Sequence, residues 1–454
     1  NFKDISFNKN NINFLSDRLS IKKDKKDYFF KGTIKNKNSF LNDDLLQIIK
    51  LKYPEFNLIN TKFQSVNDFS FNINNKLKVK NLVLNSNILV ASSQFKKNDL
   101  ISKNFIEISD LIDLKDHKIK ASYSNKKLSI EGKGQVKFQN KFEIIDYEII
   151  NDGSELNLVS NFDLSELDIK NQNLIKEYLP QTNDVLNLKN HKIKLNYKNN
   201  ILTLKGSGKI KLEKKLNKVE YFFSKKDKKY KFEVDLEINN TPLKIDFINY
   251  KKDTKLNSKL KINANYTKKF GINFKKIILS SKNNNLIINN LSIDEKNKIA
   301  KIDKIDLDYF DKSGKKNKFT LSRIKNNDYK LNGSSLNADK LITNLLKNKD
   351  EQQLDIFKEN INISINISDV YLDNDYIVKN LNGKLRIVDS NVNQAKISAL
   401  FNSNKNLTFT INTKNDEKIT TFYSSKAKPL VNRYKFIKGF EDSDEGYLDF
   451  YSSK

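Results

Sequence analysis

The chain has 454 residues, with 83 Lys plus Arg against 55 Asp plus Glu, so its formal net charge at pH 7 is 83 − 55 = +28. It has no Cys, no Met, no Trp and only two His. Without Cys there is no disulfide framework, thiolate metal site, iron–sulfur cluster or cysteine nucleophile. The two histidines, His117 and His191, do not have the spacing of a metal-binding motif. We therefore expect no cofactor and no metal site.

The positive charge does not indicate a nucleic-acid binder. Only four of the 83 basic residues are Arg, the side chain that protein surfaces favour for bidentate contacts with phosphate and guanine. The other basic residues are Lys, which commonly occupies the solvent-exposed face of a strand. These lysines could also attract anionic lipid head groups. A helix that spans a bilayer needs a run of about 18 apolar residues, and the sequence contains no such run. Because the chain has no initiator Met, we expect it to be a fragment of a longer protein, and a signal peptide or membrane anchor outside the fragment is compatible with this sequence.

Period-two alternation of apolar and polar residues is the dominant pattern, and it predicts β-strands with one apolar face. Short segments rich in Asn, Asp, Lys and Gly separate the strands, as at Asn199–Asn200. The fold class is therefore predicted to be mainly β and antiparallel. The clearest alternating runs are 128–138, 202–212, 230–238, 243–247 and 361–367.

Helical periodicity is rare, and Pro54 and Pro180 end two of the predicted helices. These helices are too few to cover a sheet, so we expect lids or end plugs. In chain order they are 43–51, 105–114, 164–179, 339–346 and 429–440.

An internal repeat is the most informative feature. Residues 114–138 align without gaps to residues 188–212 at an offset of 188 − 114 = 74, and 12 of the 25 pairs are identical. The offset persists from Tyr147 with Tyr221 to Leu164 with Ile238. The sequence therefore predicts a duplicated unit of several strands and a short helix.

The repeat assigns the histidines and the Gly-x-Gly pairs to the scaffold. His117 and His191 are equivalent, and each precedes a Lys-Ile-Lys strand start. The pairs Gly132/Gly134 and Gly206/Gly208 are also equivalent and lie inside strands, without the strand-to-helix context of a phosphate loop. Glycine inside a strand marks a bend, a close approach to the backbone or room for a ligand.

A sheet that grows by in-phase units does not fit a sandwich or a closed barrel. We predict an elongated, strongly twisted antiparallel sheet curled into a repeating β-groove, an open gutter with apolar residues inside. The predicted segments are an amino-terminal β-rich segment with a short helix (1–105), two groove repeats (106–179 and 180–253), a continuing groove segment (254–348) and a truncated carboxy-terminal segment (349–454).

The apolar phase of the repeats gives the predicted lining of this groove, which a lipid acyl chain would contact. The alternative for each residue is ordinary core packing. The predicted lining comprises Leu128, Ile130, Val136, Phe138, Leu202, Leu204, Ile210, Leu212, Phe232, Val234 and Leu236.

Several segments resemble the AsmA-like superfamily, closest to its YhdP branch, with TamB as a more distant relative. The resemblance lies in the repeated strand–Gly-x-Gly–strand units and in segments 327–346, 361–372, 378–385, 428–440 and 446–450. The chain departs from the family in its Lys and Asn enrichment and in Asp444-Glu445-Gly446, where relatives more often have a Gly pair.

The resemblance implies a periplasmic protein of Gram-negative bacteria, anchored in the inner membrane outside this sequence. It implies passive, bridge-type transport of phospholipid towards the outer membrane, in support of outer-membrane integrity, with a further periplasmic or outer-membrane partner. Its partners would be phospholipids and the inner membrane, and not nucleic acid. No nucleotide-binding loop supplies energy and no enzymatic activity is expected.

Three other functions compete with a lipid conduit. A hydrolase would need buried paired carboxylates, but Asp43-Asp44 and the acidic segment 441–445 lie in polar, turn-like contexts. A nucleic-acid binder would need aromatics between clustered basic residues, whereas Phe138 and Phe232 fall in the apolar phase of strands. An extracytoplasmic structural or adhesive β-repeat protein with a self-filled core would share the repeats, and stays open as an alternative.

Overall fold

The computed structural model describes residues 2–9, 12–24, 26–40, 58–96, 109–171, 173–340, 359–389, 391–401, 405–414, 417–434 and 446–453. Strands account for 77% of the structure and helices for 3%, which confirms a mainly β fold. The chain forms two compact units: Asn1–Asn173 with Thr182–Asp227, and Leu174–Gln181 with Lys228–Lys454. The change of unit after Asp227 falls inside the predicted repeat 180–253.

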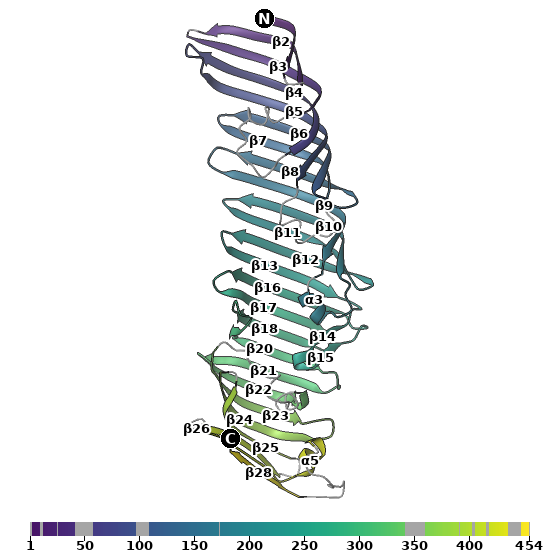
Figure 1. Cartoon of the computed structure of the whole chain (residues 1–454), viewed down its shortest axis with the longest axis vertical. Helices are drawn as coiled ribbons and strands as arrows, with labels where there is room; N and C mark the ends of the chain where they lie inside the picture. Colours follow the sequence, from purple (N-terminus) through teal and green to yellow (C-terminus); the bar gives the residue numbers. More distant parts are fainter. Residues whose placement is uncertain are drawn as a thin grey trace. The chain divides into compact units, whose positions relative to one another are not determined.

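The strands of the first unit follow one another in chain order, and each pairs antiparallel with the next (Figure 1). Among the described residues β1 pairs with β2 alone, so this sheet is open. The strands are β1 Phe2–Lys9, β2 Ile12–Asp24, β3 Asp27–Phe40, β4 Leu58–Asn74, β5 Val79–Lys96, β6 Leu111–Ser124, β7 Lys127–Lys137, β8 Phe142–Asn151, β9 Leu156–Lys170, β10 Val185–Lys198, β11 Ile201–Leu212 and β12 Lys215–Lys226.

The second unit also carries an open sheet, and it contains one parallel pair. β22 and β23 run in the same direction, with Leu331 opposite Ile365, so this pair is an exception in the otherwise antiparallel pattern. A parallel pair needs a long crossover rather than a tight turn, and 23 residues separate the two strands (361 − 337 − 1 = 23). The strands are β13 Lys229–Ile238, β16 Ser258–Thr267, β17 Gly271–Ser281, β18 Asn285–Ile293, β19 Ile299–Lys301, β20 Lys304–Phe310, β21 Lys316–Lys325, β22 Asp328–Asn337, β23 Ile361–Tyr371, β24 Ile377–Val388, β25 Asn391–Leu400, β26 Asn406–Lys414, β27 Glu417–Ser424 and β28 Leu448–Ser453.

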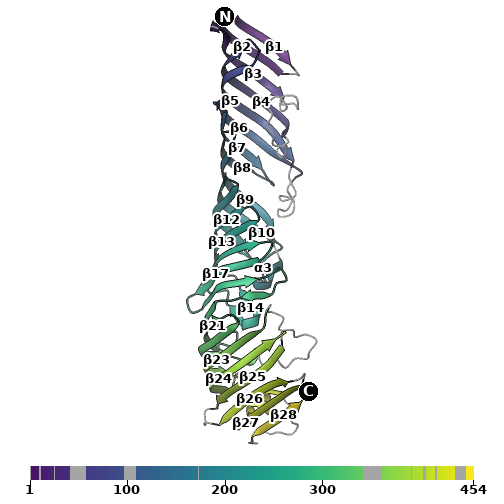
Figure 2. The ribbon, with the colours of Figure 1, turned by 90° about the vertical axis from the view of Figure 1, so that its left-hand side faces the viewer.

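The sheet of the first unit is a single layer (Figure 2). Every described strand of the first unit belongs to this one hydrogen-bonded sheet, so the described part of the unit contains no second sheet. A β-sandwich would bring strands distant in sequence face to face. The structure therefore has the layer arrangement expected of a groove.

Side chains alternate between an apolar and a polar face in the first unit. On β7, Leu128 and Ile130 are half-buried and Val136 is buried, whereas the intervening Glu131 and Lys133 are exposed. Neighbouring side chains on one face of a sheet lie within contact distance and shield one another. The apolar face of β7 is therefore better shielded than its polar face.

A β-bulge at equivalent places in the two repeats shifts the phase of this alternation. The register breaks between Lys115 and Lys118 in β6 and between Lys189 and Lys192 in β10. Asp116 (φ 53°) and Asn190 (φ 52°) occupy the left-handed region at these breaks, and such a bulge also increases the local twist of a strand. The strand therefore continues through the segment that the sequence suggested as a strand start.

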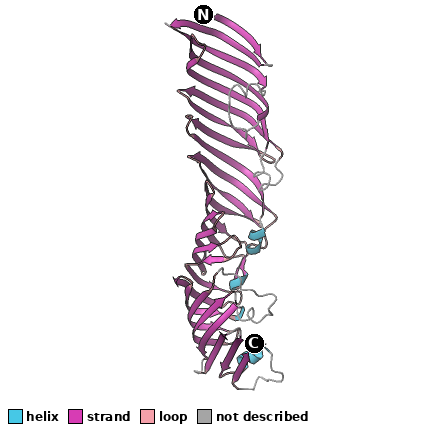
Figure 3. Cartoon of the chain, turned by 60° about the vertical axis from the view of Figure 1, so that its left-hand side comes forward, coloured by secondary structure: helices cyan, strands magenta, loops and turns pink. Residues whose placement is uncertain are grey.

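Among the described residues, helices are shorter than predicted where they can be compared, and they lie beside strand ends (Figure 3). In place of helix 164–179, β9 extends to Lys170 and α3 covers only Asn173–Tyr178. In place of the end of helix 105–114, β6 begins at Leu111. Pairing with neighbouring strands outweighs the local helical pattern in both places. α5 Lys428–Tyr434 confirms the beginning of helix 429–440.

The remaining predicted helices lie wholly or largely outside the described residues. Segment 43–51 is not described, and of segment 339–346 only the first two residues are described, as the start of a helix. The alternating run 243–247 is a strand only over β14 Leu243–Ile245, followed by the 3₁₀ helix η1 Asp246–Ile248 and by β15 Tyr250–Lys252.

The bulge at Asn190 gives a direct test of the backbone description. Asn190→Ala places an ordinary side chain at φ 52°, so it should lower the free energy of unfolding by about 1 kcal/mol. Asn190→Gly should cost less, because glycine adopts this conformation freely. The measurement is urea unfolding followed by circular dichroism. Equal losses for both variants would contradict a left-handed residue at this position.

Candidate functional site

Eight of the eleven predicted lining residues lie on the apolar face of the first unit. The register places Tyr123 opposite Leu128 on β7 and Tyr197 opposite Leu202 on β11, so the two repeats present equivalent positions to the same side. Phe138 directly follows β7. The other three, Phe232, Val234 and Leu236, are half-buried on β13 in the second unit.

The eight residues differ in accessibility. Leu128, Ile130, Leu202, Leu204 and Ile210 are half-buried. By contrast, Val136 and Leu212 are 2% and 1% exposed. Val136 packs with Ile112 in a small core that Phe138 adjoins. Leu128 and Ile130 lie near the β6–β7 turn and Leu202 and Leu204 near the β10–β11 turn, whereas the buried Val136 and Leu212 lie at the other ends of β7 and β11.

The accessible positions are joined by apolar neighbours on adjacent strands. Ala121 and Ile149 flank Ile130 in the register. Leu195 and Phe223 flank Leu204 in the same way. Cross-strand neighbours on one face lie within contact distance of each other. Leu158 is opposite both Ile149 and Tyr197 and so joins the two repeats. The strands β6 to β12 thus carry a continuous apolar surface.

A histidine and a tyrosine interact in the middle of this apolar face. Nδ1 of His117 lies 3.4 Å from the Tyr147 hydroxyl, and Nε2 lies 3.0 Å from the Gln135 carbonyl oxygen. The two rings fill the space above the glycines: a Cβ on Gly134 would lie 2.3 Å from the His117 ring, and one on Gly132 would lie 2.2 Å from the Tyr147 ring. The Gly-x-Gly pair therefore makes room for these rings.

The second repeat contains the same arrangement. Nδ1 of His191 lies 3.1 Å from the Tyr221 hydroxyl, and Nε2 lies 3.0 Å from the Lys209 carbonyl oxygen. The His191 ring covers Gly208 and the Tyr221 ring covers Gly206. We call these two arrangements the His–Tyr pairs.

The His–Tyr pairs are held uncharged. The Gln135 carbonyl requires an Nε2–H donor, so Nδ1 of His117 is left to accept the hydrogen bond that the Tyr147 hydroxyl donates. Burial lowers the pKa of His117 and of His191. Burial also raises the pKa of Tyr147 and of Tyr221 to about 12. The side chains of the two His–Tyr pairs are thus neutral and hydrogen-bonded at neutral pH.

The tyrosines are the residues that sequence reasoning missed at this site. Tyr147 and Tyr221 were visible as equivalent residues of the repeat, but no role followed from that. The signal that could have found them is that His, Gly-x-Gly and Tyr all repeat at the same offset. A glycine inside a strand often marks a place where another group approaches the backbone closely. Only the cross-strand register shows that they meet.

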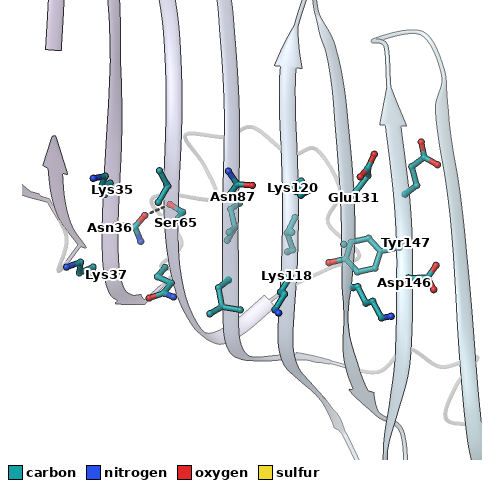
Figure 4. Close-up of a pocket in the computed structure, with 18 of the residues that line it drawn as sticks. Lys35, Asn36, Lys37, Ser65, Asn87, Lys118, Lys120, Glu131, Asp146 and Tyr147 are labelled. Carbon is teal, nitrogen blue, oxygen red and sulfur yellow. Dashed lines mark hydrogen bonds between the residues drawn. The ribbon is translucent and has the colours of Figure 1, made fainter. Parts of the chain in front are cut away.

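A furrow of about 850 Å³ crosses seven consecutive strands, β3 to β9, in the first unit (Figure 4). On most strands its lining is three consecutive residues, such as Lys118–Lys120 on β6, but β9 contributes Val159 and Asn161 and not the intervening Ser160. Ser160 is opposite Tyr147 on the apolar face. The furrow therefore lies on the polar face, between two rows of outward-pointing side chains.

The charges along this furrow have mixed signs. Its lining contains Lys118, Lys120 and Lys133 together with Glu131 and Asp146. A phosphate or nucleic-acid site would concentrate positive charge. The furrow consequently offers no specific anion site, and it is separate from the predicted lining.

In the second unit, the short hairpin β14–β15 covers part of the sheet. The Tyr309 hydroxyl on β20 donates a hydrogen bond to the Ile248 carbonyl oxygen at 2.7 Å. The Tyr250 and Tyr309 rings meet edge to face, with centroids 5.7 Å apart. Tyr250 and Tyr309 are 0% and 2% exposed. This unit therefore fills some of its apolar surface with its own residues.

Within the described part of the chain, no three His, Asp or Glu side chains are grouped so that they could hold a metal ion. Likewise, none of the described helices is long and apolar enough to cross a membrane. The acidic pairs at 43–44 and the segment 441–445 lie outside the described residues. No family model, curated protein or solved structure matches the chain.

Gly132 gives a test of the His–Tyr pairs. Gly132→Ala would place Cβ 2.2 Å from the Tyr147 ring, so we expect a loss of about 1–3 kcal/mol in the free energy of unfolding. Tyr147→Leu combined with Gly132→Ala should cost less than the sum of the single changes, because the clash is relieved. Gly446→Ala is the control, since no atom lies within 4 Å of its Cβ position. Additive losses at Gly132 and Tyr147 would contradict the contact.

The His–Tyr pairs also predict a pH dependence. Because the pKa of both histidines is lowered in the folded state, the unfolded chain binds more protons once the pH falls below about 6.5. The free energy of unfolding should therefore fall between about pH 7 and pH 5, and His117→Gln with His191→Gln should flatten this part of the profile. Urea unfolding at several pH values measures it. An unchanged slope in the double variant would contradict buried, neutral histidines.

Proposed function

We propose that this protein is a periplasmic lipid-conducting β-groove that carries phospholipid acyl chains between the inner and outer membranes by passive, bridge-type transport. The observation that carries the proposal is the single-layer sheet of the first unit. Its apolar face is continuous across strands and has no second described layer packed on it. Soluble proteins rarely leave so much apolar surface without a partner.

An acyl chain is the partner whose chemistry suits this face. Half-buried residues such as Ile130 and Leu204 leave apolar surface in contact with water. Burying one methylene group is worth about 0.8 kcal/mol, and this gain has no directional requirement. A flexible chain could therefore slide along equivalent positions of the successive repeats without losing specific bonds.

The His–Tyr pairs are compatible with this use. A charged side chain on the floor would bind head groups and oppose the passage of acyl chains. His117 and His191 instead have a lowered pKa, and their hydrogen bonds go to tyrosine and to backbone carbonyls. The resemblance to the AsmA-like superfamily points to the same function, with phospholipids as cargo and with the anchor in the inner membrane outside this sequence.

A structural or adhesive β-repeat protein is the second candidate, and the filled regions favour it. Ile112, Val136 and Leu212 are 0%, 2% and 1% exposed, and β14–β15 covers part of the second unit. If packing of this kind extends along the whole face, no room is left for lipid. The discriminating measurement is mass spectrometry of an organic extract of natively purified protein. Phospholipid in the extract supports the conduit, and lipid-free protein supports the structural alternative.

Charges placed on the apolar face test the conduit directly. Ile130→Asp with Leu204→Asp should remove most co-purifying phospholipid and the transfer of fluorescent phospholipid between vesicles, because an ionised carboxylate on the floor is costly to desolvate. Ser129→Asp with Ser207→Asp is the matched control, since these residues lie on the same strands β7 and β11 and point to the polar face. Both variants should first be shown to be folded by circular dichroism. Similar lipid loss in the two variants would refute a one-sided groove.

A further inference from the structure

The turn between β4 and β5 presents an unusually apolar tip. Leu77 is 83% exposed and Val79 is 55% exposed. On the neighbouring strand β3, Tyr28 is 42% exposed, and the register places it opposite Ile73, which in turn pairs with Val79. These side chains form one patch at the tight-turn edge of the first unit, and we call it the tip patch.

The residue at the apex is a poor choice for the turn itself. Leu77 has φ 55°, in the left-handed region, where a leucine side chain is disfavoured. Equivalent turns of this unit use residues that suit that region, namely Asn125 (φ 50°) and Asn199 (φ 51°). The Asn74 side chain and backbone hold the turn by accepting hydrogen bonds from Lys76, Leu77 and Lys78. Neither turn geometry nor contact with water therefore explains an exposed leucine here.

Lysines surround the tip patch. Lys76 and Lys78 alternate with Leu77 and Val79, and both lysines are exposed. Lys80 also lies beside the patch, and its Nζ is 3.8 Å from an Asp27 carboxylate oxygen. Lys22 and Lys23 are exposed on the same end of β2, where Lys23 is opposite Tyr28. The described side chains around the patch thus carry an excess of positive charge.

We propose that the tip patch docks on an anionic lipid bilayer. Lysine next to exposed aliphatic and aromatic side chains matches the interface of such a membrane: the apolar tip enters the acyl region, and the ammonium groups extend back to the negative head groups. A purely apolar protein partner would not require the lysines, and an acidic protein surface would not require the protruding aliphatic tip. This inference is independent of lipid conduction, because Leu77 and Val79 are not part of the predicted lining.

Because the chain has no Trp, a single introduced Trp reports on one site. We expect the emission of Leu77→Trp to shift to shorter wavelength with vesicles of phosphatidylglycerol and phosphatidylcholine, and not with phosphatidylcholine alone. The shift should diminish at high salt, because screening weakens surface attraction. Asn125→Trp is the matched control: it is an exposed residue with a left-handed backbone (φ 50°) in a turn at the same edge, and its emission should not change.

Charge reversal separates the two parts of the proposal. In the Leu77→Trp protein, Lys76→Glu with Lys78→Glu should abolish the shift, whereas Lys126→Glu with Lys127→Glu at the neighbouring turn should preserve it. Circular dichroism confirms folding, and quenching by brominated lipids reports insertion depth. An unchanged Leu77→Trp spectrum, an equal shift at Asn125→Trp, or an equal shift with neutral vesicles would overturn the proposal. A groove that binds lipid but fails this test leaves the proposed function standing.

Discussion

The first unit depends on one constraint: a single-layer sheet must place most of its apolar side chains on one face and shield them without a second layer. Strand pairing satisfies the backbone, so the sheet extends strand by strand without a packed partner. Neighbouring side chains on that face shield one another in part, and residues such as Leu128 and Leu204 are half-buried. Apolar surface that stays in contact with water lowers the stability of the fold, and this is the surface that we propose carries lipid.

The two His–Tyr pairs show how polar groups are accommodated on such a face. Each pair lies over a Gly-x-Gly segment, and its histidine and tyrosine side chains hydrogen-bond to each other. Each repeat can therefore hold polar side chains on the apolar face without placing a charge there. The bulges at Asp116 and Asn190 make this possible, because they shift the alternation so that the histidine that follows points to the apolar side.

Much of the fold was predictable from local pattern, and the errors have a common cause. The alternating runs and the Asn-rich turns are local signals, so β7, β11 and the turn at Asn199–Asn200 follow from them. The predicted helices 105–114 and 164–179 are too long, because residues from Leu111 onward belong to β6 and residues up to Lys170 belong to β9. Strand pairing is a non-local interaction, so the local helical pattern did not reveal it. The parallel pair β22–β23 likewise depends on a crossover that local periodicity does not encode.

The sequence by itself determined the strand-rich class, the 74-residue repeat and the set of apolar residues that share a face, because these follow from side-chain periodicity. Tertiary structure decided which of those residues stay accessible: Ile130 is half-buried while Val136 is buried. It also decided that Tyr147 meets His117, and that Leu77 protrudes from the sheet with lysines around it. The physical reason is register, since contacts across strands depend on which residues pair, and a periodic pattern is compatible with more than one pairing.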